Sequence, residues 1–350
     1  MPTAELDKTH ALTAPGQGNQ TIGMGLDLSQ RSDAARIVWE KSAEALRPHL
    51  GFDFKELVWH GTRDGVAFDA DPKEAEKKAF RFLTNTENAQ PAIIIDGAAR
   101  FAALRESGQL GSPYYYSGYS LGLATILHAV GSLSTEAAVQ LGKGRGDAFK
   151  YAIEREPETT MLALIGLESK VLTEVTDKYN LETCLISTDQ QRVMGGLVEN
   201  VRGAVDHLTN LGITRGVKSL EGFVDAAFHS KYFAKAVPDF TEVVYDTKID
   251  LPENGVLIGA SVEAKQLLTI EDIRQSLISQ LTNTENWASV IRYLWASGVR
   301  TMTELNNTPR LVNMNIEMLG GQRPQRLATP STGEGDRGVT IGQRWLAVAA

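Results

Sequence analysis

The stretch "YYYSGYSLGLAT" spans residues 114–125, and the interpretation of the whole chain depends on it. Its opening tyrosines, residues 114–116, are typical of a β-strand, and the apolar residues 121–130 have the composition of a buried helix. Between them, Gly118-Tyr119-Ser120-Leu121-Gly122 fits the pattern Gly-x-Ser-x-Gly, in which small neighbours allow a sharp turn around a serine nucleophile. The pattern also fits an ordinary glycine-rich turn, so the role of Ser120 depends on the rest of the sequence.

The composition limits the class of protein. The chain has 350 residues, 42% of them hydrophobic, which is enough for one large domain with an insert or for two domains. A formal net charge of −8 argues against nucleic-acid binding, and no stretch approaches the ~20 apolar residues of a membrane span. The N-terminus does not resemble a secretory signal, and Cys184 is the only cysteine. We therefore expect a soluble cytoplasmic protein.

Strand-like and helix-like segments alternate in the first part of the chain. Residues 11–14 are a short strand candidate that leads into a glycine-rich loop, and residues 33–46 have a helical pattern. Residues 60–78 are polar and indicate a surface excursion. A helix is predicted over residues 91–107, with Pro91 in its first turn, and another over residues 135–155, with Ser134 as its N-cap. This order predicts an α/β core.

The pattern changes near residue 159. Strand, helix, two strands, helix and a strand ending near residue 226 follow one another, which is typical of a ferredoxin-like unit. We expect residues 1–157 and 227–320 to form one large α/β subdomain with a parallel sheet, into which residues 158–226 are inserted as a small α+β subdomain. Residues 321–350 contain few core residues and are expected to be a C-terminal extension.

A serine nucleophile needs a base. The six candidates are His10, His49, His60, His128, His207 and His229. The first five lie in polar or helical contexts, where surface exposure or helix packing explains them. His229 lies between a strand-like and a helix-like segment, so it is the candidate most able to reach Ser120 from a loop at the sheet edge.

Several segments together resemble one family, the malonyl-CoA:acyl carrier protein transacylases and the related acyltransferase domains of fatty acid and polyketide synthesis. The matching segments keep the family's order and spacing over about residues 11–320. They are Pro15-Gly16-Gln17-Gly18-Asn19-Gln20, Gly23-Met24-Gly25, Thr86-Glu87-Asn88-Ala89-Gln90-Pro91-Ala92, Gly118-Tyr119-Ser120-Leu121-Gly122, Gly144-Arg145-Gly146 and Phe228-His229-Ser230. The resemblance implies an α/β-hydrolase-like core and an enzyme that transfers a malonyl group by a ping-pong reaction.

The resemblance also implies roles for individual residues. Ser120 would be the nucleophile and His229 the base, oriented by main-chain carbonyls and not by an acidic residue. The N–H groups of Gln17 and Leu121 would form the oxyanion hole. Arg145 would bind the malonyl carboxylate, because a guanidinium can make two parallel bonds to one carboxylate.

Three further residues are implied to shape the substrate site. Gln280 resembles a glutamine that orders the site, and Phe228 would leave little room for an α-methyl branch and so favour malonyl over methylmalonyl. Tyr119 adjoins the nucleophile and would influence acyl selection. Malonyl-CoA and a phosphopantetheinylated acyl carrier protein are the implied substrates, with no metal, no further cofactor, no nucleic acid and no membrane. We expect a monomer whose Lys231 and Lys235 help to bind the acidic carrier.

The sequence departs from the family at four places. Tyr119 replaces a histidine and Leu123 replaces a glutamate, while residues 187–191 and 306–309 differ from the family's loops.

Two other functions remain open. A serine hydrolase or thioesterase of the α/β-hydrolase type would need an acidic residue between Ser120 and His229, for which Asp189 and Asp225 are available. A non-enzymatic relative is the third reading, although the intact Ser120, His229, Arg145 and Gln17 argue against it.

Overall fold

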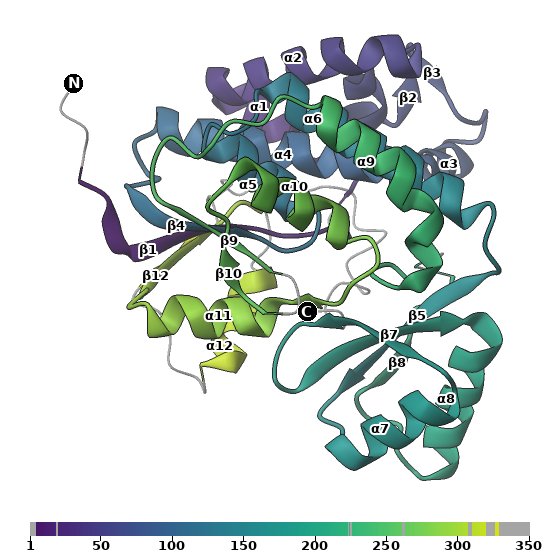
Figure 1. Ribbon diagram of the computed structural model, residues 1–350. Helices are drawn as coiled ribbons and strands as arrows, with labels where there is room; N and C mark the ends of the chain where they lie inside the picture. The colour runs from purple at the N-terminus through teal and green to yellow at the C-terminus, as the bar shows by residue number, and fades with distance from the viewer. Residues whose placement is uncertain are drawn as a thin grey trace.

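In the computed structural model, residues 5–18, 20–222, 224, 226–260, 263–306, 310–319 and 326–328 are described, and a mixed six-stranded sheet lies at their centre (Figure 1). Its order is β10 (Lys265–Gln266), β9 (Val256–Gly259), β4 (Pro113–Gly118), β1 (Asp7–Ala14), β12 (Thr301–Glu304) and β13 (Arg326–Ala328). Every neighbouring pair is parallel except β9 and β10. Ala14 pairs with Gly118, so the loop after β1 and the turn after β4 leave the sheet side by side.

Helices cover both faces of this sheet (Figure 1). On the upper face in the figure lie α2 (Asp33–Leu50), α4 (Thr86–Glu106), α5 (Gly122–Ala129) and α6 (Thr135–Ile153). The lower face carries α11 (Trp287–Ala296) and α12 (Arg310–Met318). Side chains alternate along β1 accordingly: Leu12 packs in the upper core, and Ala11 packs in the lower core with Trp287.

The remaining elements of the larger unit surround this core. They are α1 (Leu26–Arg31), the π-helix η1 (Glu56–His60), β2 (Thr62–Arg63), β3 (Val66–Ala67), α3 (Pro72–Thr84), the 3₁₀-helix η2 (Lys231–Ala236), α9 (Val237–Asp246) and α10 (Ile270–Ser279). Among the described helices, none combines the length and the apolar character that crossing a membrane requires.

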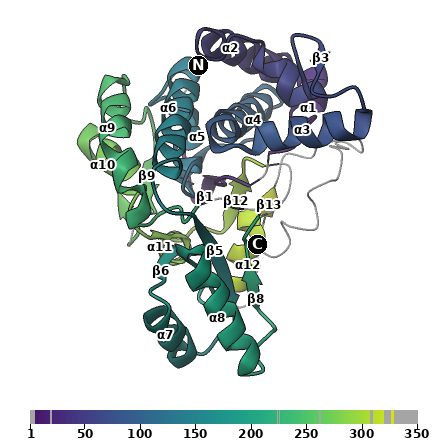
Figure 2. The same cartoon turned by 90° about the vertical axis from the view of Figure 1, so that its right-hand side faces the viewer.

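A smaller unit projects from the core (Figures 1 and 2). It consists of β5 (Thr159–Ile165), α7 (Ser169–Lys178), β6 (Glu182–Ile186), β7 (Gln191–Leu197), α8 (Val198–Asn210) and β8 (Val217–Ser219). Its strands form a sheet in the order β11, β6, β7, β5, β8, in which β11 (Glu285–Asn286) comes from the larger unit and runs parallel to β6. The two units therefore share one sheet.

Several boundaries differ from the sequence-based expectation. The helix expected to begin at Pro91 begins at Thr86, so Pro91 lies inside α4, where its missing N–H removes one helical bond without ending the helix. The last strand of the smaller unit ends at Ser219 and not near residue 226. The polar excursion at residues 60–78 contains most of the first two turns of α3, which Asp71 caps. By contrast, Ser134 caps α6 as predicted, by accepting a bond from the amide of Ala137.

The C-terminal part of the chain is described only at residues 326–328, which form β13 and pair with β12. The expectation of an extension over residues 321–350 otherwise lies outside the described residues. The same holds for Asn19, Asp225 and residues 307–309.

Candidate active site

Ser120 lies in a strained turn between β4 and α5. Its φ of +52° falls in the left-handed region, which a non-glycine residue adopts only when its surroundings hold it there. The flanking glycines are sterically required, since a Cβ on Gly118 would lie 2.1 Å from the carbonyl carbon of Gly122, and a Cβ on Gly122 would lie 2.1 Å from the oxygen of Ala14. The turn therefore has the geometry of a nucleophile elbow, with Leu121 at the start of α5.

His229 meets Ser120 across the site. Its Nε2 lies 2.8 Å from the serine Oγ, and its Nδ1 lies 2.6 Å from the main-chain oxygen of Gln280, at the end of α10. Because a carbonyl can only accept, Nδ1 carries the proton and Nε2 is left to accept from the serine hydroxyl. His229 itself has a φ of +61°, so both partners of this dyad are held in the left-handed region.

The surroundings keep His229 neutral. Burial, followed by the charge of Arg145, lowers its pKa to about 3, and the bond to Gln280 only partly opposes this. The imidazole is therefore uncharged at neutral pH and can accept a proton. An anion bound at Arg145 would cancel part of the positive charge and so make His229 a stronger base.

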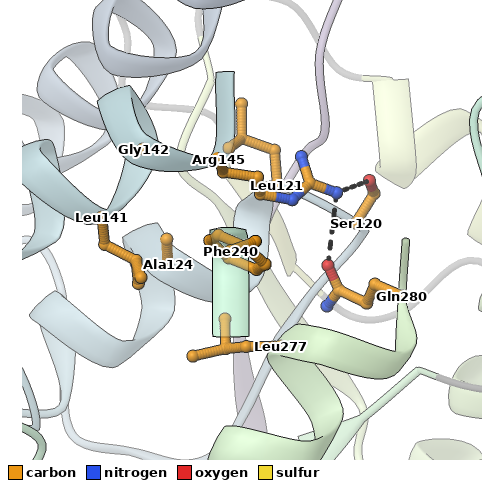
Figure 3. Close-up of a pocket in the computed structure, with 9 residues that line it drawn as sticks. All are labelled: Ser120, Leu121, Ala124, Leu141, Gly142, Arg145, Phe240, Leu277 and Gln280. Atoms are coloured by element: carbon orange, nitrogen blue, oxygen red, sulfur yellow. Dashed lines mark hydrogen bonds between the residues drawn. The ribbon is translucent and has the colours of Figure 1, made fainter. Parts of the chain in front are cut away.

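Arg145 projects from α6 toward the nucleophile (Figure 3). Its Nη2 lies 3.4 Å from Ser120 Oγ and 3.5 Å from Gln280 Oε1, and its Nη1 donates to Gln90 Oε1 at 3.0 Å. The guanidinium is 4.5 Å from the ring centre of Phe149. Burial lowers its pKa to about 10, so it still carries its charge at neutral pH.

Arg145 is prepared for an anion. The residue is 4% exposed, its Nε has no hydrogen-bond partner, and no carboxylate in the described residues forms an ion pair with it. A buried charge without a counter-ion is costly, which is why such sites normally bind an ion of opposite sign. A ligand carboxylate beside Ser120 would supply that ion.

A chain of hydrogen bonds connects Arg145 to the loop after β1. The amide of Gln90 accepts from Arg145 and donates from its Nε2 to Thr86 Oγ1 at 2.9 Å. The hydroxyl of Thr86 in turn donates to Oε1 of Gln17 at 3.3 Å. Gln17, a predicted oxyanion residue, is thus positioned through the first turn of α4.

A small cavity opens beside the nucleophile (Figure 3). Ser120, Arg145 and Gln280 form its polar end, and apolar side chains form the rest. The lining residues are Ser120, Leu121, Ala124, Leu141, Gly142, Arg145, Phe240, Leu277 and Gln280. Four of the predicted site residues, Ser120, Leu121, Arg145 and Gln280, line this cavity, and His229 contacts Ser120 and Gln280 beside it.

Two predicted substrate-binding residues lie outside this lining. Tyr119 packs in the lower core against Trp287, with ring centres 5.5 Å apart, and its hydroxyl lies 3.1 Å from Ser187 Oγ. Burial raises the pKa of Tyr119 well above its usual range, so it stays neutral. Phe228 stacks on Phe149, the ring that also covers the guanidinium of Arg145. Phe228 therefore contacts the site only indirectly, through the ring of Phe149.

Other predicted features are placed as follows. Leu123 is 1% exposed and packs in the upper core. Lys231 and Lys235 are ion-paired with Glu182 and Glu156, at 2.6 Å and 3.0 Å, so their positive charge is offset. Asp189 is half exposed and pairs with Arg292, whereas Nδ1 of His229 meets a carbonyl.

Sequence reasoning missed two residues at the site. Gln90 was recognised as part of a motif without a role, although a polar residue next to Pro91 in an otherwise apolar helix is a usable signal. Glu285 was not recognised. Its carboxylate is fully buried and accepts a bond from the amide of Ser120 at 3.3 Å, and no local pattern around it indicates that position.

Comparison with known proteins agrees with this geometry. Residues 13–313 match the family model described as the acyl transferase domain. The chain is 29% identical over 328 residues to a malonyl CoA-acyl carrier protein transacylase of Bacillus subtilis, covering 91% of this chain and 94% of the relative.

Solved structures share the fold. An acyl-carrier-protein-S-malonyltransferase from Bartonella henselae has a TM-score of 0.77 at 27% identity, over 97% of this chain and 99% of that one. A malonyl-transacylase in complex with a type II PKS acyl-carrier protein has a TM-score of 0.75 at 23% identity, over 97% and 98% of the two chains. The chain therefore belongs to the acyl transferase domain family, and the protein is an acyltransferase.

Proposed function

We propose that this acyltransferase moves a malonyl group from malonyl-CoA to the phosphopantetheine thiol of an acyl carrier protein. The observation that carries the proposal is the buried, unpaired Arg145, with Nη2 3.4 Å from the nucleophile of a Ser120–His229 dyad. The names of the Bacillus subtilis and Bartonella henselae relatives support the same donor and acceptor.

The reaction proceeds in two half-reactions on Ser120. His229 Nε2 takes the hydroxyl proton while Oγ attacks the thioester carbonyl, and the oxyanion is stabilised by the amides of Leu121 and Gln17. When the carbon–sulfur bond breaks, His229 returns the proton to the CoA sulfur. The carrier thiol then attacks the acyl-serine in the reverse sequence. The main-chain oxygen of Gln280 keeps the required tautomer throughout, by accepting a hydrogen bond from Nδ1–H of His229 at 2.6 Å.

Arg145 selects the acyl group in this scheme. A malonyl carboxylate pairs with its guanidinium and replaces its weak 3.4 Å contact to Ser120 Oγ. That contact is longer than an ordinary hydrogen bond, so breaking it costs little free energy. An acetyl group offers no such partner, and the buried charge stays uncompensated.

The proposal extends to the fold of the two units. We infer an α/β-hydrolase-like core over residues 1–157 and 227–320, supported by the parallel sheet and the strand–turn–helix around Ser120. The strand order β8, β5, β7, β6 and the intervening α7 and α8 support a ferredoxin-like insert over residues 158–226.

No observation favours the hydrolase alternative. An α/β-hydrolase would orient its histidine with an acidic side chain. Here the main-chain oxygen of Gln280 accepts the hydrogen bond from Nδ1 of His229, and Asp189 pairs with Arg292. The uncompensated charge of Arg145 also has no use in a general esterase.

The proposal is tested by the fate of the acyl group. Incubation with malonyl-CoA should add one malonyl group to Ser120, detectable by mass spectrometry of the intact protein and its peptides. Addition of phosphopantetheinylated carrier should move that group to the carrier thiol. Ser120→Ala should form no adduct, while Ser117→Ala, three residues away on β4, should still form one. Release of malonate to water in the presence of carrier would instead establish a hydrolase.

We further infer that the protein acts as a monomer in the cytoplasm, without a metal or cofactor. One chain supplies every residue of the proposed mechanism, and the single thiol, Cys184, is buried and free. Light scattering during gel filtration tests the monomer, and an unchanged rate after dialysis against a chelator tests the absence of a metal.

A further inference from the structure

Glu285 places a buried carboxyl group against the nucleophile, and the mechanism above does not use it. The residue is fully buried on β11, the strand that joins the sheet of the smaller unit. Its Oε2 accepts a hydrogen bond from the main-chain amide of Ser120 at 3.3 Å. Its Oε1 is buried and has no hydrogen-bond partner.

Burial and two neighbouring groups determine the charge of this carboxyl. Burial raises the pKa of Glu285 to about 8 and outweighs the amide of Ser120 and the charge of Arg145 on α6, both of which favour the ionised form. Tyr119, the other titratable group that interacts with it, stays neutral. Glu285 is thus neutral below about pH 8 and becomes ionised above it, while Arg145, whose pKa is about 10, keeps most of its charge up to about pH 9.

We propose that Glu285 is a specificity-determining residue, which as a neutral acid leaves the charge of Arg145 free for a dicarboxylic acyl group and as a carboxylate cancels that charge. The proposal rests on the proposed function, since it concerns the carboxylate that Arg145 binds. In both states an oxygen of Glu285 can hold the amide of Ser120, so the elbow is kept while the preference for the acyl group changes. Acetyl transfer is insensitive to the switch, because an acetyl group has no carboxylate to be repelled.

The first experiment compares two donors that differ only in the acyl group. The rate of acyl-Ser120 formation is measured by quenched flow and mass spectrometry with malonyl-CoA and with acetyl-CoA, from about pH 6.5 to about pH 9, below the pKa of Arg145. The ratio of malonyl to acetyl rates should fall by about tenfold or more across pH 8, because a second negative charge then faces the acyl carboxylate. Effects of pH on His229 or on the CoA phosphates act on both donors and cancel in the ratio.

The matched variant is Glu285→Gln, which keeps an oxygen for the Ser120 amide and cannot ionise. Its malonyl-to-acetyl ratio should be about the same at pH 7 and at about pH 9, where Arg145 still carries most of its charge. Glu304→Gln is the control, because Glu304 is also fully buried but bonds to the amides of Arg310 and Val312 at the start of α12. Its ratio should fall with pH as in the unaltered protein. A constant ratio in the unaltered protein, or an unchanged fall in Glu285→Gln, would overturn the proposal.

A binding measurement covers the case in which Glu285→Gln does not fold or no acyl-serine forms. Monomethyl malonate, the half-ester of malonic acid, is a monoanion that resembles the malonyl thioester. It is titrated at pH 8 by calorimetry in buffers of different ionisation enthalpy. Binding at Arg145 should return Glu285 to its neutral form, with uptake of about half a proton per site. Binding without proton uptake would overturn the role of Glu285. Proton uptake without any acyl-Ser120 would instead contradict the proposed function alone.

Discussion

At the scale of single residues, two departures from the family's motifs contact each other. Tyr119 stands where a histidine is expected, and its hydroxyl lies 3.1 Å from Ser187, in the loop at residues 187–191 that also departs. A phenol is longer than an imidazole and needs a polar partner when it is buried. The hydroxyl of Ser187 supplies that partner, so the two differences form one local arrangement.

The proposed role of Arg145 predicts a selective defect. Arg145→Ala should lower acylation of Ser120 by malonyl-CoA by about 100-fold, corresponding to ~3 kcal/mol, because the acyl carboxylate would enter a buried site without a counter-ion. Acetyl-CoA should lose less than about tenfold. The loss of malonyl acylation in Arg145→Lys should lie between that of the unaltered protein and that of Arg145→Ala, since lysine retains the charge without the planar fork. The measurement is kcat/KM for each donor, and equal losses for both would remove Arg145 from carboxylate binding.

At the scale of elements, the elbow depends on two strands approaching a helix start closely. Gly122→Ala should destabilise the fold by about 3 kcal/mol or more, because its Cβ would meet the main-chain oxygens of Ala14 and Pro15 at 2.1 Å and 2.8 Å. Gly212→Ala is the control: this residue has a φ of +75° but open space around it, and the change should cost about 1 kcal/mol. Urea denaturation measures both, and similar midpoints would contradict the steric argument.

The elements that the sequence predicted are those with local signals. The strand and helix around Ser120, the cap of α6 and the alternation in the smaller unit follow from residues within a few positions of each other. Short strands such as β12 and β9 were missed, because only pairing with distant partners makes them strands. Glu285 was missed for the same reason: a Thr-Glu-Asn-Trp segment looks like a surface turn until β11 brings it under Ser120.

At the scale of the whole molecule, the two units meet at the site and are tied together by several contacts. β11 adds a strand from the larger unit to the sheet of the smaller unit. Thr284 donates to the carbonyl of Thr183 at 2.6 Å, and Lys231 on η2 pairs with Glu182 on β6 at 2.6 Å. These contacts involve Lys231, two residues after His229, and the strand of Glu285, which bonds to Ser120, so the site lies close to the boundary between the two units.

Docking of an acidic carrier is expected on this side of the molecule. Replacing both Lys231 and Lys235 by Ala should raise the KM for the carrier a few-fold and flatten its salt dependence, because rim charges mainly steer association. The effect should be modest, since each lysine already pairs with a glutamate. Initial rates with carrier at several salt concentrations test this, and Lys41→Ala together with Lys73→Ala, on α2 and α3, is the matched control. Loss of acylation by malonyl-CoA alone would indicate damage to the site and contradict a docking role.

The hydrogen-bonded chain from Arg145 through Gln90 and Thr86 to Gln17 has a consequence for protein engineering. Replacing Arg145 to admit a neutral acyl group frees the amide of Gln90 to rotate, and Gln17 then loses its support through Thr86. A change of substrate made at Arg145 alone would therefore reduce turnover for every donor. A redesigned enzyme needs a new partner for Gln90 in the same step, so selectivity and rate have to be altered together.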